Sequence, residues 1–183
     1  MPGTSIITSG RFTSVVVHRH QVYAADCEQN QTQVFQHDDT ASSKSAAAAT
    51  WTKLRTIDHE FHNKFWITIS ISNNQLKCCS AGDHIIKVYS LQSGELLRKN
   101  STRGSAESNQ LYCPFISDDD GSALIAGSIK DRLQVMSEQG EFTVLQLEPP
   151  VPVPRSAVLF NNCLYVTSSP DKGRRKNAIY KYF

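Results

Sequence analysis

Short apolar runs alternate with polar turn segments along the whole chain, and this pattern predicts strands. In the segment 66–72, isoleucine at positions 67, 69 and 71 alternates with threonine or serine at positions 68, 70 and 72. Such a period of two is typical of a strand with one buried face. Turn signals such as Asn73-Asn74 and Asp120-Gly121 separate the runs, and no segment shows a helical stripe. The pattern therefore predicts an all-β fold.

One spacing recurs four times: an aromatic residue or proline stands ten positions before an apolar residue that opens a short run. The pairs are Phe12/Val22, Trp66/Leu76, Pro114/Leu124 and Pro154/Leu164. The copies are separated by 54, 48 and 40 residues, which suits one four-stranded antiparallel blade per repeat. We therefore predict a β-propeller of about four blade units, which forms either a small closed ring or a partial propeller.

The predicted strands fall into four units, and the last unit is one strand short. They cover residues 14–18, 22–26, 32–36, 51–57, 66–72, 76–80, 85–91, 96–100, 113–118, 123–128, 132–137, 142–147, 156–160, 163–168 and 178–183. We expect Ser5–Thr8 to supply the missing strand and to close the ring, because closure removes exposed edges. The chain is predicted to be one domain over residues 1–183, with a flexible low-complexity loop at 37–50.

The alternation of apolar and polar residues also predicts which side chains form the core. The expected core residues are Ile67, Ile69, Ile71, Val88, Leu124, Val135, Val144, Leu164 and Val166.

Composition narrows the possible surroundings and partners. The net charge of the 183 residues is only +2, so no long-range field for nucleic acid follows. No run of about 18 apolar residues is present, so no membrane helix is expected, and the first ten residues lack the features of a secretion signal. The five cysteines are odd in number and form no C-x-x-C motif, so we expect buried thiols in a reducing, cytoplasmic setting.

Three stretches resemble a known repeat. Ser80–Tyr89 resembles the hairpin of NHL repeats, and Leu124–Val135 is similar to it, including the Arg-Leu-Gln-Val ending. Pro154-Arg-Ser-Ala-Val, followed by Leu164-Tyr-Val-Thr, is similar to the opening of the repeat. Over residues 63–183 the chain resembles the C-terminal propeller of invertebrate TRIM-NHL-type proteins, although WD-type blades share much of the pattern.

The resemblance implies a non-enzymatic platform that binds a protein partner, in the manner of the substrate-recognition part of a ubiquitin-ligase-related protein. Two positions depart from the family pattern: Gly127 stands where an acidic residue is usual, and Asp131 replaces an asparagine. Family propellers commonly have six blades, whereas four units fit here. The dense Cys/His spacing of RING and B-box modules is also missing from these residues, so ligase activity itself is not expected.

No catalytic, metal or cofactor motif stands out. His59 and His62 are three positions apart rather than the four that a metalloprotease helix needs, and we expect them to be solvated loop residues. His18 and His20 fall on one face of a predicted strand but lack a third ligand. The run Asp118–Gly121 lacks the spacing of a calcium loop and is predicted to be a hairpin turn. We expect no enzyme activity and no cofactor.

One basic cluster, Lys172-Gly-Arg-Arg-Lys176, interrupts the last unit. An RNA-binding propeller face is therefore an alternative to protein binding. The candidate contact residues are Lys172, Arg174, Arg175, Lys176, Arg132 and Arg155.

A propeller hydrolase or lactonase is a third alternative. It would need ligands gathered at the channel mouth, whereas Asp26, Asp83 and Asp131 fit the pattern of turn residues.

Overall fold

The structure, a computed structural model, describes residues 10–37, 51–64, 66–80, 82–101, 115–117, 121–127, 132–168 and 178–183. These residues form four antiparallel sheets, which we call blades 1 to 4. Blade 1 contains β1 (Phe12–His18), β2 (Gln21–Asp26), β3 (Gln31–His37) and β4 (Trp51–Asp58). Blade 2 contains β5 (Ile67–Ser72), β6 (Gln75–Ser80), β7 (Ile85–Ser90) and β8 (Leu96–Ser101). Blade 3 contains β9 (Phe115–Ser117), β10 (Ala123–Gly127), β11 (Arg132–Met136) and β12 (Phe142–Leu145). Blade 4 contains β13 (Pro154–Phe160), β14 (Cys163–Ser168) and β15 (Ala178–Tyr182).

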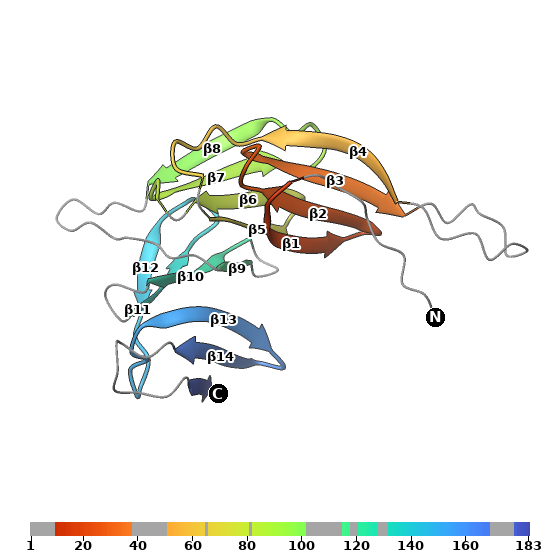
Figure 1. Ribbon diagram of the computed structural model, residues 1–183. Helices are drawn as coiled ribbons and strands as arrows, with labels where there is room; N and C mark the ends of the chain where they lie inside the picture. The colour runs from red at the N-terminus through yellow and green to blue at the C-terminus, as the bar shows by residue number, and fades with distance from the viewer. Residues whose placement is uncertain are drawn as a thin grey trace, which may run out of the picture.

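The blades follow one another in an arc (Figure 1). The first strands carry the chain of contacts, because β1 packs against β5, β5 against β9, and β9 against β13. In the described part of the chain, no strand of blade 1 packs against a strand of blade 4. The all-β propeller prediction is confirmed, and the described blades form an open arc rather than a closed ring. Ser5–Thr8 and residues 38–50 lie outside the described residues.

The ten-residue spacing has a simple structural origin. In blades 1, 2 and 4 it joins a residue at or just before the start of the first strand to a residue in the second strand, across a two-residue turn. In blade 2 this turn is Asn73-Asn74, with φ values of 47° and 55°, and in blade 4 it is Asn161-Asn162, with φ values of 49° and 58°. Asparagine tolerates this left-handed conformation better than most residues, and such turns match the twist of the flanking strands.

Blades 1 and 4 repeat each other in register. Val16 lies opposite Tyr23 in blade 1, and Val158 lies opposite Tyr165 in blade 4. Both first strands carry a register irregularity at the same place, between Phe12 and Ser14 and between Pro154 and Ser156. Equivalent positions in the two blades can therefore be compared directly.

Each contact between successive blades has its own apolar core. Between blades 1 and 2 the buried residues include Tyr23, Val34, Ile57, Ile67, Leu76 and Tyr89. Between blades 2 and 3 they are Cys79, Ile86, Val88, Ala123, Ile125 and Met136. Between blades 3 and 4 they are Ala126, Leu133, Val151, Ala157 and Val166. Three interfaces of stacked sheets thus replace the single core of a two-layer domain.

The prediction of a half-buried strand at 66–72 was wrong in one respect. Thr68 and Ser70 are only 6% and 7% exposed, nearly as buried as Ile69 at 6%. Blade 2 lies between blades 1 and 3, so both faces of β5 are covered. The predicted core residue Val144 is 42% exposed, because it lies on β12, the outermost strand of blade 3.

The other expected core residues are buried or half-buried. Ile67, Ile69, Val88 and Val166 are buried, and Ile71, Leu124, Val135 and Leu164 are half-buried. The described residues contain no helix that is long and apolar enough to cross a membrane.

Candidate rim site

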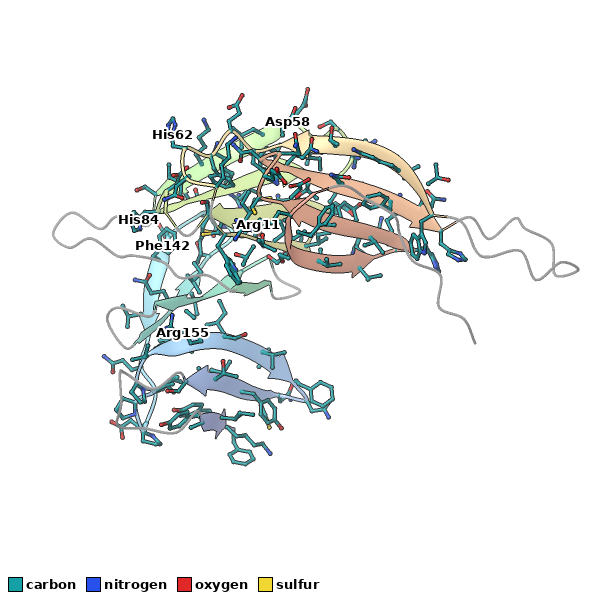
Figure 2. All side chains as sticks on the ribbon, in the orientation of Figure 1. Arg11, Asp58, His62, His84, Phe142 and Arg155 are labelled. Carbon is teal, nitrogen blue, oxygen red and sulfur yellow. The ribbon has the colours of Figure 1, made fainter. Side chains whose placement is uncertain are left out.

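The site is built at one end of the blades, which we call the entry rim. It comprises Arg11 before β1, the β2–β3 turn, the connection from β4 to β5, and the β6–β7 turn. A pocket of about 690 Å³ opens there, lined by Arg11, Cys27, Glu28, His62, Asn63 and Lys64. Figure 2 shows Arg11 and His62 among the side chains at this end of blades 1 and 2. Residues from three separate segments therefore meet around one hollow.

Asp26 fixes the first wall of the pocket. Its fully buried carboxylate accepts hydrogen bonds from the backbone N–H groups of Glu28 (3.0 Å), Gln29 (3.1 Å) and Arg11 (3.3 Å). The amide of Gln33 donates to the other oxygen at 3.0 Å. Such bonds are the usual means by which aspartate stabilises a turn. Asp26 is therefore a structural turn residue, as its position in the sequence suggested.

Asp83 fixes the opposite wall. Its two carboxylate oxygens accept the backbone N–H groups of His62 (2.7 Å) and Asn63 (2.9 Å), and the Ser80 hydroxyl donates to the carbonyl of Asn63. The turn of blade 2 thereby holds the connection that arrives from blade 1. Asp131, which occupies the comparable place in blade 3, lies outside the described residues.

Four of the described residues that line the pocket are exposed. Arg11, His62 and Lys64 are basic, and Glu28 is acidic. Two positions after Lys64, the indole of Trp66 is 52% exposed immediately before β5. Exposed tryptophan and arginine side chains are enriched where proteins bind one another.

The connection between β4 and β5, which supplies His62, Asn63 and Lys64 to the pocket, is anchored by a mostly buried polar cluster made by Asn30, Thr32, His59, Lys87 and Tyr89. His59 is fully buried, and its Nε2 lies 2.8 Å from the hydroxyl of Thr32. The carbonyl of His59 accepts bonds from the Lys87 ammonium and, at 3.2 Å, from the Tyr89 hydroxyl. Lys87 also donates to the carbonyl of Glu60 at 3.0 Å.

The charges in this cluster follow from burial. Burial, together with the nearby Lys87 charge, lowers the pKa of His59 to about 3, so the imidazole is neutral. Burial also lowers the pKa of Lys87 and raises that of the Cys78 thiol. The expectation that His59 is a solvated loop residue was therefore wrong, whereas His62 is exposed. His59 and Cys78 have no exposed surface, so the cluster serves the fold rather than a substrate.

The predicted basic face is only partly described. Lys172, Arg174, Arg175 and Lys176 lie outside the described residues. Arg132 opens β11, and Arg155 is an exposed residue at the start of β13 (Figure 2). Pro154 lies opposite Ser168, and Ser168 lies opposite Ala178, so Arg155 is near the end of blade 4 at which β14 ends and β15 begins.

The candidate metal ligands do not gather. β1 ends at His18, and Arg19 and His20 form the following turn with φ values of 47° and 64°. The alternation had suggested that His18 and His20 share one face of a strand. This expectation was wrong, because His20 lies in the turn after the strand. Asp118–Asp120 lie outside the described residues, and within the described ranges no group of three or more His, Cys, Asp or Glu side chains could hold a metal ion.

The cysteines behave mostly as small core residues. Cys27, Cys78 and Cys79 are buried free thiols, Cys163 is a half-buried free thiol, and Cys113 lies outside the described residues.

A second pocket, of about 340 Å³, lies where blade 3 meets blade 4. It is mainly apolar and is lined by residues such as Leu133, Leu147, Val151 and Pro154, with Glu148 at its edge. Two of these residues, Leu133 and Val151, belong to the core between the two blades. The pocket is therefore an incompletely filled edge of that interface.

Comparison with known proteins shows the fold class. A streptogramin B lyase structure superposes with a TM-score of 0.63 at 12% identity, over 98% of this chain and 56% of the lyase chain. The hydrazine synthase of Kuenenia stuttgartiensis gives a TM-score of 0.69 at 10% identity, over 99% of this chain and 48% of its own. The computationally designed protein Ika4 gives a TM-score of 0.60 at 10% identity, over 96% and 92%.

These structures are similar to the chain in fold alone. The lyase and the synthase are β-propeller proteins, so the fold defines this chain as propeller-like. The chain spans about half the length of each. No family model matches the sequence, and no curated protein matches it. The NHL resemblance stays a prediction.

Sequence reasoning missed the pocket residues Arg11, Glu28, His62 and Lys64. The available signal was their position beside elements that the repeat did identify. Arg11 precedes Phe12, Glu28 follows Asp26, and Lys64 precedes Trp66, the aromatic residue of the second copy.

Proposed function

We propose that this chain is a binding module that recognises a segment of a protein partner at the entry rim. The observation that carries the proposal is a pocket of about 690 Å³ lined by Arg11, His62 and Lys64, with the half-exposed Trp66 two positions after Lys64 in the chain. An indole supplies a large rigid contact, and the basic groups favour an acidic side chain next to it. The partner segment is therefore expected to pair an acidic residue with an apolar one.

The construction of the rim supports this proposal. Asp26 and Asp83 hold the backbone of both walls through N–H bonds. The pocket is therefore organised before a partner arrives, which lowers the entropic cost of binding. The propeller fold alone does not distinguish a binding module from an enzyme, because the same fold occurs in a lyase. Substrate selection for a ubiquitin ligase is the narrower form of the proposal and rests on the TRIM-NHL resemblance.

A display experiment tests the proposal. The immobilised chain is screened against random 12-residue peptides and, in parallel, against random single-stranded RNA of the same length. We expect peptides that combine acidic and apolar residues to be enriched, with dissociation constants on the order of micromolar. Trp66→Ala should weaken the selected peptides by roughly tenfold or more.

The chain offers a matched control, because its only other tryptophan, Trp51, begins β4 at the far end of blade 1. Trp51→Ala should leave peptide binding unchanged. Failure to enrich any peptide, or enrichment that does not depend on Trp66, would contradict the proposal. Retention of RNA that is lost in Arg155→Ala and kept in Trp66→Ala would favour the RNA-binding alternative.

A further inference from the structure

The two ends of the arc carry exposed apolar sheet faces. On blade 4, Val158 is 50% exposed and Ile179 is 72% exposed, on the face turned away from the core shared with blade 3. On blade 1, Val15 is 61% exposed and Val17 is 69% exposed on β1, whereas Ala24 and Phe35 on the same face of β2 and β3 are buried. Every other blade face in the arc is covered by a neighbouring blade.

The exposed face of blade 4 corresponds to a face that is buried elsewhere in the molecule. Val158 and Tyr165 are paired as Val16 and Tyr23 are paired in blade 1, with the same register irregularity before them. In blade 1, Val16 and Tyr23 belong to the core against blade 2. Blade 4 therefore presents the surface on which a following blade would pack.

The exposed face of blade 1 has buried counterparts as well. The ten-residue spacing aligns Val15 with Ile69 in blade 2 and with Ala157 in blade 4. Ile69 and Ala157 are each 6% exposed, because each packs on the preceding blade. On β1, blade 1 therefore presents part of the surface that would pack on a preceding blade.

These two surfaces are the two halves of one blade interface, and they do not meet within the described arc. The propellers that the chain matches, the lyase and the hydrazine synthase, are about twice as long as the arc. We propose that a second copy of this chain completes the ring, with blade 4 of each copy packed on blade 1 of the other.

A two-fold axis along the centre of the ring satisfies both contacts at once, which makes the assembly a closed dimer. Each contact would bury Val158 and Tyr165 of one copy against Val15 of its partner, in the way that Val16 and Tyr23 pack with Ile69 in blades 1 and 2. A stable protein–protein interface buries about 1,200–2,000 Å² of surface in total. In the dimer, this area would be shared between the two contacts. Dimer formation would also enclose the central channel and bring two entry rims onto one face.

Sedimentation velocity of the 183-residue chain tests the proposal. At a chain concentration of about 10 μM, in the micromolar range of dissociation constants, we expect one species with twice the 20.4 kDa mass of a single chain. Val15→Lys and Val158→Glu should each give a folded monomer, because each places a charge in both contacts. The double variant should dimerise again, because the two charges face each other across each contact.

Leu97→Lys is the matched control, since Leu97 is 52% exposed on β8, the outermost strand of blade 2. This variant should remain dimeric, and circular dichroism should show the same strand content for all variants. A wild-type monomer, an open-ended series of oligomers, or single variants that stay dimeric would each overturn the proposal. If the wild-type chain is a monomer, the exposed faces would instead be contact surfaces for blades other than those of a second copy.

Discussion

The interface between blades 1 and 2 and the interface between blades 3 and 4 stack similar sheets but are held together differently. The first combines a large apolar core with directional polar bonds between blades. The hydroxyl of Thr13 donates to the carbonyl of Ile67 at 2.6 Å, and the Ser14 hydroxyl accepts the N–H of Ile69 at 3.2 Å. Arg55 donates to the carbonyl of Gln92 at 2.7 Å, reaching from β4 to the β7–β8 turn.

The interface between blades 3 and 4 relies on a smaller apolar core with many partly buried members, among them Leu164, Tyr180 and Tyr182. Among its polar contacts, the hydroxyls of Ser168 and Tyr182 donate to the carbonyls of Pro152 and Pro149 in the connecting segment, each at 2.5 Å. A repeated strand pattern therefore sets how the blades stack, whereas individual polar residues set how firmly each pair of blades is fixed.

The largest expected difference comes from one leucine in each interface. Leu76 and Leu164 occupy equivalent places in the ten-residue spacing, but Leu76 is fully buried whereas Leu164 is half-buried. Leu76→Ala should lower the free energy of unfolding by about 2–5 kcal/mol, and Leu164→Ala by roughly half as much. Urea unfolding followed by circular dichroism measures both. Equal losses would show that the two interfaces are packed alike.

The next effect depends on pH and belongs to the first interface. The pKa of His59 is lowered from 6.5 to about 3 in the folded state, so below pH 6.5 the unfolded chain takes up a proton that the folded chain excludes. The free energy of unfolding should therefore decrease as the pH falls, by about 1.5 kcal/mol between pH 6.5 and 5. All six histidines lie before residue 85, so blades 3 and 4 contribute no histidine.

Unfolding measured across this pH range, with two variants, isolates the effect. His59→Gln should have a flatter profile, although the protein is less stable at pH 7, whereas His62→Gln should keep the wild-type profile because His62 is exposed. A wild-type profile in His59→Gln would show that another group is responsible.

The smallest effect concerns a single hydroxyl between blades. Thr13 donates to the carbonyl of Ile67 and accepts its N–H at 3.2 Å, so Thr13→Val should cost about 1–2 kcal/mol. Thr167 donates to the carbonyl of Ser156 at 3.3 Å within blade 4, and Thr167→Val should cost less, about 0.5 kcal/mol. Thermal unfolding midpoints compare the two variants. If Thr167→Val lowered the unfolding midpoint more than Thr13→Val, the directional bonds would not be the feature that stabilises the first interface.

The sequence predicted the strands well because their signal is local. Alternation and turn residues placed all fifteen strands found in the described residues, and the strand Cys163–Ser168 was predicted with its observed bounds. Burial was harder to predict, because it depends on which sheet covers which face. Ser70 is buried by the neighbouring blade, and Val144 is exposed by its place on the last strand of its own blade.

The candidate site was largely missed for a related reason. Its residues come from three segments that only the stacking of blades 1 and 2 brings together. No short motif joins Arg11 to Lys64, and the chemistry of His59 follows from its burial rather than from its sequence neighbours. The basic cluster was visible because its charges are adjacent in sequence, whereas the pocket is assembled in space.

The carboxylates of Asp26 and Asp83 have a consequence for how this surface can change. They hold the rim through the backbone N–H groups of Glu28, Gln29, His62 and Asn63, which every residue except proline possesses. Side chains at these four positions can therefore be replaced while the backbone path stays the same. The rim is suited to diversification: a library that varies these positions and keeps both aspartates would sample new binding specificities on one unchanged frame.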